Sequence, residues 1–313
     1  MDIGRAYRVT VGAVRLRQLE YFVAICESGS FSAAANELLV AQPSLSQQVR
    51  ALEGELGAEL LERGRQGVAL TAAGRVFLPK ARAVLAAVDE ARKSVTDLVG
   101  GFVGELHVLT VRSVASGVLP AGIVRWHDEY PATVLRLHDY SHRRDLEAAM
   151  RAGQGDLAIG PRPRDWDGPV ETLGFESLVV AGRGPYDTPR ASVAELGAAK
   201  WVHFESEQGM SEVLEWAARS LGFTPRVVAR VGQVAAALRL AVEGIGYTII
   251  PANAVPHGWS QHVRPLEPTL YREMTAYGRG PMVQLARRFV DLLTSVELPL
   301  VTPEELPSDA LVC

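Results

Sequence analysis

The sequence predicts an α/β chain in three parts: an all-helical N-terminal domain, a linker helix and a two-lobed α/β domain. Three observations predict this order. Apolar residues at helical spacing fill the region up to about residue 57. A seven-residue apolar repeat then follows over 77–98. From Glu105 onward, short apolar runs alternate with helical patterns, which is typical of parallel sheets flanked by helices.

Length and composition indicate a soluble globular protein. A chain of 313 residues can form two or three domains with sizeable cores, and 48% hydrophobic with 22% charged residues is ordinary. No run approaches the apolar length of a membrane span, and the N-terminus lacks the apolar stretch of a signal peptide. The cytoplasm is therefore the expected location. Residues 1–13 show no periodicity and are expected either to form a disordered extension or to reflect the choice of start site, since Val14 could itself mark the start.

The reactive residue types show no pattern of a redox or metal site. Cys26 falls on the apolar stripe of the first helix and is predicted to be a small core residue. Cys313 is expected to be mobile. The seven histidines are scattered without metal-ligand spacing, so neither a metal nor a cofactor is predicted.

The helix predicted over 43–57 has two distinct faces. Its apolar face carries Leu45, Val49, Leu52 and Leu56, and its opposite face carries Pro43, Ser46, Gln47 and Arg50. Gln can pair with adenine and Arg with guanine, and Ser hydroxyls can bind phosphate, so this face suits the major groove of DNA. Taken alone, the helix could equally be an ordinary amphipathic surface helix.

The neighbouring segments favour the DNA interpretation. A first helix is predicted over 16–28, and a short one starts after a cap at Ser30, with Phe31 and Leu38 at the ends of its apolar stripe. Residues 39–42 then form a connection of helix-turn-helix length. The stretch 60–71 predicts a two-stranded wing with Arg63 and Arg65 at its tip. These parts in this order are far more specific than any one of them.

The stretch from Leu16 to Gly74 resembles the winged helix-turn-helix of the LysR-type transcriptional regulators. The matching segments are LRQLEYFVAICESGSFSAAANEL, AQPSLSQQVRALEGELGAELLER and VALTAAG. Gln47 stands where the family often has a basic residue, and Leu61 where it usually has Phe. The resemblance implies that double-stranded DNA is the partner. The implied contact residues are Ser30, Ser32, Gln42, Pro43, Ser44, Ser46, Gln47, Arg50, Arg63 and Arg65.

Charge limits how strongly one copy can bind DNA. Residues 14–75 contain six Arg and seven Glu, so the basic footprint of this domain must be local. We therefore expect modest non-specific affinity, and binding that depends on two or more copies per site.

The linker helix is predicted over 71–99 from two series of apolar residues. Phe77, Val84, Ala91 and Leu98 form one series, and Ala81, Val88 and Val95 form the other. Such a seam between two domains predicts a partner helix, and the resemblance likewise implies a homodimer through this helix and a further pairing into a homotetramer. The alternative is that the stripe packs on its own domain. Pro79 predicts a kink, and residues 100–104 predict a hinge.

The C-terminal part is expected to form two lobes. The predicted division is 14–70 for the DNA-binding domain, 71–99 for the linker, and 105–298 for the effector domain, with lobe one at 105–178 and 265–298 and lobe two at 179–264. The segments VLPAGIVRWHDEYPATVLRLHDY, GQGDLAIG and AVEGIGYTIIPANAV resemble the LysR effector domain, itself similar to periplasmic binding proteins. Residues 299–313 are expected to be a loose tail.

A small-molecule effector is expected where the carboxyl ends of the strands meet. The residues predicted to line that crevice are Arg112, Ser113, Ser141, His142, Pro161, Glu205 and Ser206. Arg112 adds a positive charge, whereas Glu205 would repel a second carboxylate. We therefore expect an effector with a single carboxylate or a comparable polar group.

Two other classes of protein are weaker alternatives. A two-lobed solute-binding protein for transport would not need the N-terminal helices and would need an export signal. An enzyme is third: Gly244 and Gly246 lack the rest of a dinucleotide motif, and Ser206 has no histidine placed near it by a recognised motif. The sequence thus favours a transcriptional regulator that responds to a small molecule and is not an enzyme.

Overall fold

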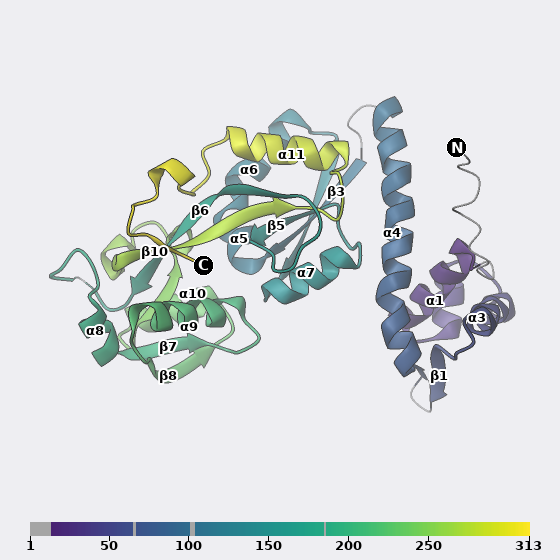
Figure 1. Cartoon of the computed structure of the whole chain (residues 1–313), viewed down its shortest axis with the longest axis horizontal. Coiled ribbons are helices and arrows are strands. Elements are labelled where there is room, and N and C mark those ends of the chain that lie inside the picture. The colour runs from purple at the N-terminus through teal and green to yellow at the C-terminus, as the bar shows by residue number, and fades with distance from the viewer. Residues whose placement is uncertain (1–13, 65–66, 101–103, 185) are drawn as a thin grey trace, which may run out of the picture. The chain divides into compact units, whose positions relative to one another are not determined.

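A computed structural model describes residues 14–64, 67–100, 104–184 and 186–313, with the side chains of 63, 64, 90 and 93–100 outside the description. The predictions for residues 1–13, for Arg65, for the Arg63 side chain and for the centre of the hinge therefore lie outside the described part. The chain divides into two compact units, one running to Arg92 together with 151–154, the other containing the rest. Figure 1 labels many of the helices and strands of both units.

The first unit is a winged helix-turn-helix. Its elements are α1 (Leu16–Ser28), α2 (Phe31–Glu37), α3 (Gln42–Leu56), β1 (Leu61–Gly64) and β2 (Gly67–Leu70), followed by α4 (Ala72–Gly100). The strands β1 and β2 pair antiparallel, which confirms the predicted wing. The helix α4 continues through Pro79 without interruption.

Local signals fix where these helices begin and end. The Ser30 hydroxyl accepts a hydrogen bond from the Ala33 amide at the start of α2, as predicted for a cap. Gly57 ends α3 with a left-handed φ of 67°. Thr71 caps α4 by accepting a hydrogen bond from the Gly74 amide at 2.9 Å. In the turn between α2 and α3, Leu39 has a φ of 52° and is 92% exposed.

The core of the first unit takes part of the seam predicted on α4. Phe22, Ile25, Leu45 and Leu52 are fully buried, and Phe77 of α4 packs its ring 5.5 Å from that of Phe22. Ala81 is also buried in this core, whereas Val84 remains 45% exposed. The first positions of the seam, Phe77 and Ala81, therefore pack on their own domain. Val84, further along α4, remains exposed and could contact a partner helix.

The second unit contains the remaining elements. They are β3 (Gly104–Val111), α5 (Arg112–Gly117), α6 (Leu119–Glu129), β4 (Thr133–Tyr140), α7 (Arg143–Arg151), β5 (Leu157–Pro161), β6 (Val170–Ala181), α8 (Val193–Ala198), β7 (Lys200–Phe204), α9 (Gly209–Leu221), β8 (Arg226–Val231), α10 (Val234–Val242), β9 (Thr248–Pro251), β10 (Val263–Tyr277), α11 (Gln284–Ser295) and β11 (Leu311–Val312). Short 3-10 helices lie at Ala252–Ala254, Ser260–His262 and Pro303–Glu305.

The main sheet is mixed, which corrects the expectation of parallel sheets. Its order is β4-β3-β5-β10-β6-β9, with β11 beside β10. The strand β3 is parallel to β4 and β5, but β10 is antiparallel to both β5 and β6. The strand–helix–strand pattern was interpreted correctly for β3 to β5 and for the parallel pair β7 and β8. The long strands β6 and β10 break this pattern because they pair antiparallel, one carrying the chain into the second lobe and the other carrying it back.

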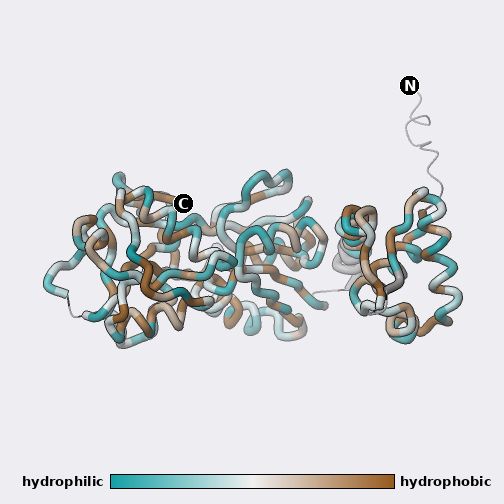
Figure 2. The backbone as a smooth tube through the Cα atoms, turned by 90° about the horizontal axis from the view of Figure 1, so that it is seen from below, coloured by the Kyte–Doolittle hydropathy of each residue, from teal (hydrophilic) through white to brown (hydrophobic). Residues whose placement is uncertain are grey.

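Each lobe has its own hydrophobic core. The first is centred on Leu106, Trp126 and Phe289, and the second on Trp201, Phe204 and Leu214. The strand β10 contributes Met274 to the first core and Leu270 to the second, so it runs through both lobes. The predicted lobe limits at 178/179 and 264/265 fall inside these crossing strands. Figure 2 shows brown, hydrophobic stretches of the backbone in the interior of this unit and teal, hydrophilic ones in its outer loops.

The C-terminal segment is ordered, contrary to the prediction of a loose tail. The strand β11 pairs with β10 in parallel, and the Cys313 amide donates to the Tyr271 carbonyl oxygen at 3.0 Å. Leu311 packs against the second core. Within the described part of the chain, no helix has the length and apolar character needed to span a membrane.

Candidate functional site

The outer face of α3 is the first candidate site. Leu45, Val49 and Leu52 turn into the core of the first unit. The exposed face carries Gln42, Pro43, Ser44, Gln47 and Arg50. Because a helix with one buried stripe presents its other side to the surroundings, these donors and acceptors can reach the edges of bases in a groove. Ser32 on α2 is also exposed, and Ser30 is half-buried in its cap.

Ser46 does not belong to this exposed face. It is only 8% exposed, because it stands next to Leu45 and one turn before Val49 on the helix. The prediction that Ser46 projects toward DNA was therefore wrong. The remaining α3 residues predicted for the interface are exposed as expected.

Hydrogen bonds in a partly buried position connect the wing to the helices. The Glu53 carboxylate of α3 accepts hydrogen bonds from the amides of Leu60 and Leu61 at 2.9 and 3.1 Å, where the first wing strand begins. The Val68 amide donates to the Gly29 carbonyl oxygen at 3.1 Å. These bonds hold the strands of the wing against the helical core.

The second candidate site is a cavity of about 670 Å³ between the two lobes. It lies at the carboxyl ends of β3, β4 and β5, as expected for open α/β lobes. The ends of β7 and β8 and the first residues of α9 and α10 line the cavity from the second lobe. Its volume suits a small metabolite.

The cavity contains four of the seven predicted residues. Arg112, Ser113, Ser141 and Pro161 line it. His142 does not, because it is 1% exposed and its Nε2 lies 3.2 Å from a Glu212 carboxylate oxygen. Glu205 and Ser206 are exposed outside the lining, and the Ser206 hydroxyl donates to Glu207. The predictions for His142, Glu205 and Ser206 were therefore wrong. Because Glu205 does not line the cavity, it does not limit the effector to a single carboxylate.

The sequence did not identify the second lobe's lining, several first-lobe residues, or the contributions of β10 and the C-terminal segment. The missed polar residues and aromatics are Ser116, Arg143, Arg162, Arg164, Phe204, Gln208, Glu212, Glu215, Trp216, Arg219, Gln233 and Arg272, together with Met210 and Cys313. Gln208 and Gln233 could have been found, since each begins the helix that follows a recognised strand. Arg272 and Cys313 could not, because β10 and its partner β11 carried no recognisable sequence signal.

Most of the lining arginines are already paired with carboxylates. Arg112 lies 3.1 Å from Asp139, Arg143 lies 2.9 Å from Glu147, and Arg162 lies 2.9 Å from Glu273. Arg272 forms an ion pair with the fully buried Glu176. The lining therefore offers many N–H donors without a large excess of positive charge, which suits a ligand with a single carboxylate better than a polyanion.

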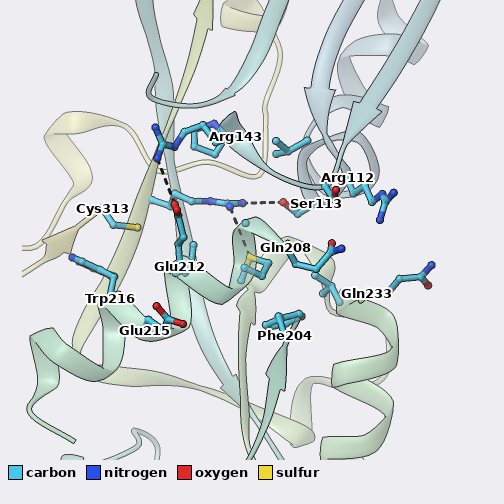
Figure 3. A pocket seen from close by; sticks show the side chains of 18 of the residues that line it. Arg112, Ser113, Arg143, Phe204, Gln208, Glu212, Glu215, Trp216, Gln233 and Cys313 are labelled. Carbon is cyan, nitrogen blue, oxygen red and sulfur yellow. Dashed lines mark hydrogen bonds and ion pairs between the residues drawn. The ribbon is translucent and has the colours of Figure 1, made fainter. Parts of the chain in front are cut away.

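Three contacts join the lobes beside the cavity. The Gly209 amide donates to the Ser141 carbonyl oxygen at 2.8 Å. The Glu212 carboxylate meets His142 at 3.2 Å and Arg143 at 3.4 Å, and the Arg143 ion pair is drawn in Figure 3. Any ligand that changes the position of Glu212 would therefore alter how the lobes are held together.

The cavity also contains a thiol. Figure 3 shows Cys313 and Trp216 on one side of the cavity and Phe204 with Gln233 on the other. Burial raises the pKa of the Cys313 thiol to about 11, against the opposing effect of Arg272. Burial likewise raises the pKa of Cys26 to about 11. Both thiols are therefore neutral near pH 7 and poor nucleophiles.

Comparison with known proteins explains this combination of sites. Residues 16–75 match the family described as "Bacterial regulatory helix-turn-helix protein, lysR family", and residues 100–297 match the LysR substrate binding domain. The chain belongs to the LysR family. As a LysR-type transcriptional regulator, it binds DNA through its N-terminal domain and a small-molecule effector through its C-terminal domain.

Relatives of this LysR-type regulator are named as HTH-type transcriptional regulators. The HTH-type transcriptional regulator ClcR of Pseudomonas putida is 31% identical over 252 residues, which cover 79% of this chain and 85% of that one. TfdS of Cupriavidus pinatubonensis is 34% identical over 252 residues, covering 77% and 83%. These relatives are transcriptional regulators rather than enzymes or transport proteins.

Solved LysR-family structures share the fold. A full-length OxyR variant from Pseudomonas aeruginosa aligns with a TM-score of 0.71 at 21% identity, covering 90% of this chain and 97% of that chain. Full-length CbnR in complex with its target DNA aligns with a TM-score of 0.51 at 25% identity, covering 90% and 99%. The predicted family and fold class are thus confirmed.

Proposed function

We propose that this LysR-type regulator reads its operator with the exposed face of α3. The observation that carries the proposal is the separation of faces: Gln42, Ser44, Gln47 and Arg50 are exposed while Leu45 and Val49 are buried. Gln47 and Arg50 suit base edges, and the smaller Ser44 suits phosphate. The resemblance adds Ser30, Ser32, Arg63 and Arg65 as backbone contacts around this face.

We further propose that two protomers pair through α4. Val84 is 45% exposed, and Val88 follows it on the same seam and is only half-buried. A two-fold pair would place two copies of α3 on successive turns of the duplex, which compensates for the weak basic charge of one domain. From the resemblance, we also propose that two dimers pair into a tetramer through their effector domains. The domain limits 14–70, 71–99 and 105–298 are likewise proposals. Because operator DNA is the partner, we expect the protein to act in the cytoplasm.

The effector is proposed to be a small metabolite with one carboxylate and an apolar body. Arginine N–H groups and the Ser113 and Ser141 hydroxyls can hold the polar group. Phe204, Trp216 and Val234 offer apolar surface for the rest. Occupation of the cavity would change the contacts of Glu212 and with them the angle between the lobes, which is how the signal would reach the DNA-binding domains.

The DNA assignment is tested by removing base contacts one at a time. Gln47→Ala and Arg50→Ala are each expected to weaken specific binding by about 1–3 kcal/mol, because a base-edge pair is lost, while non-specific binding changes less. The measurement is a gel-shift titration against operator and scrambled duplexes at several salt concentrations. Arg125→Ala is the control, since it removes an exposed arginine of α6 that pairs with Glu129. Operator affinity unchanged in both α3 variants would refute the assignment.

A further inference from the structure

A buried ion pair lies beside the effector cavity, which Arg272 lines. Glu176 of β6 is 0% exposed and Arg272 of β10 is 4% exposed, on two strands that run through both lobes. The second oxygen of Glu176 accepts a hydrogen bond from the Asn253 side chain at 3.1 Å. Both oxygens of the carboxylate therefore have hydrogen-bond partners, and its negative charge balances the positive charge of Arg272.

The guanidinium of Arg272 is not satisfied to the same extent. An arginine has five N–H donors. The Nε and Nη2 atoms of Arg272 donate to Glu176, and Nη2 also donates to the Ser113 hydroxyl at 2.9 Å, drawn as a dashed line in Figure 3. Among the described residues, the acceptor recorded for Nη1 is the Met210 sulfur at 3.8 Å. A thioether is a weak acceptor, so the two hydrogens of Nη1 lack a strong partner.

We propose that Nη1 of Arg272 is the donor that selects the effector, by binding one carboxylate oxygen of it. This inference rests on the proposed function of the cavity, which Arg272, Ser113 and Met210 all line. A buried donor without an acceptor is costly, and a ligand oxygen at this point removes that cost. The Ser113 hydroxyl accepts from Arg272 and can turn its own hydrogen toward the same ligand oxygen.

The position of Arg272 also defines what the cavity rejects. Because Glu176 already balances the positive charge of Arg272, a carboxylate oxygen supplies the strong acceptor that Nη1 lacks, and a second negative charge gains little here. An ammonium group at the same point would face the positive guanidinium with only the weakly accepting Met210 sulfur beside it, so its binding would be disfavoured. Met210, buried at 6% exposure on α9, occupies the place beside Nη1 with a group too weak to compete with a carboxylate.

The substitution Met210→Gln tests this by supplying an acceptor from the protein itself. Glutamine has nearly the same length as methionine, and its side-chain carbonyl can bond Nη1 and so compete with the ligand. The probes are butyrate, hexanoate and phenylacetate, each measured beside the alcohol of the same skeleton by thermal shift and titration calorimetry. The parent should bind at least one carboxylate more tightly than its alcohol. Met210→Gln should lower the affinity for that carboxylate about tenfold, which corresponds to the loss of one charge-assisted hydrogen bond.

Two further variants make the result decisive. Met210→Leu removes the sulfur without adding an acceptor and should stay within about threefold of the parent. Arg272→Lys keeps a cation beside Glu176 but removes Nη1, and it should also lower the affinity for the carboxylate probe. Equal affinities of Met210→Gln and Met210→Leu, or of Arg272→Lys and the parent, would overturn the proposal, as would a parent that binds no probe more tightly than its alcohol. Gel shifts with operator DNA are run in parallel. A parent protein that does not bind operator DNA would refute the proposed function, whereas the ligand measurements test only the role of Arg272.

Discussion

Glu176→Ala is expected to destabilise the effector domain by about 3–5 kcal/mol, because it leaves the buried Arg272 guanidinium without its counter-ion. Glu176 is completely buried, and the substitution also removes the acceptor of the Asn253 amide. The measurement is urea denaturation followed by tryptophan fluorescence. All five tryptophans lie between residues 126 and 259, so this signal reports on the effector domain alone.

A surface carboxylate on the same domain is the matched control. Glu129 pairs with Arg125 within α6, and both side chains are substantially exposed. Glu129→Ala should therefore cost no more than about 1 kcal/mol. If Glu176→Ala were as mild as this control, the ion pair on β6 and β10 would not hold the two crossing strands together as argued.

Val84→Glu is expected to convert the regulator to a monomer and to abolish tight operator binding together with dimerisation. Val84 is 45% exposed within the protomer, so a carboxylate there leaves the fold of the single chain intact. In a paired seam the same carboxylate faces its copy across an apolar contact, and each buried ion costs several kcal/mol. Dimer affinity should fall by about a hundredfold or more, since each 1.4 kcal/mol is a factor of ten.

The same substitution at Val76 separates the seam from the rest of the helix. Val76 is 71% exposed on α4 but lies outside both apolar series of the seam. Val76→Glu should leave the dimer intact in light scattering at micromolar concentration, while Val84→Glu should give the mass of one chain. A parent protein that is itself monomeric, or a Val84→Glu variant that remains dimeric, would exclude pairing through this face.

The DNA-binding unit could be predicted almost completely from sequence because its signals are local. Helical spacing identified Leu45, Val49 and Leu52, the Ser30 cap set the start of α2, and Gly57 ended α3. Ser46 was misplaced because it lies at the edge of the buried stripe, where residue type and spacing do not settle exposure. Phe77 and Ala81 were assigned to a partner helix because the periodicity of α4 does not show which neighbour buries each turn.

The effector domain was predicted less well because its decisive contacts are distant in sequence. The alternation of short apolar runs with helical patterns from Glu105 onward identified this domain as α/β. By contrast, Arg272 meets Ser113 across 159 positions, and no local pattern joins them. His142 was placed correctly at a strand end, but its side chain is committed to Glu212 of the other lobe. The expectation of a single carboxylate remains, although its support has moved from Glu205 to the paired arginines of the lining.

We infer that this protein recognises a specific DNA sequence through α3 and does so as a two-fold assembly. The most direct test is repeated selection of bound duplexes from a random DNA pool by the full-length parent, with Arg50→Ala selected in parallel. We expect an enriched pseudo-palindrome whose half-sites are about one or more helical turns apart, and relaxed preference at one base pair of each half-site for Arg50→Ala. Base frequencies that stay random after repeated rounds with the parent would contradict it.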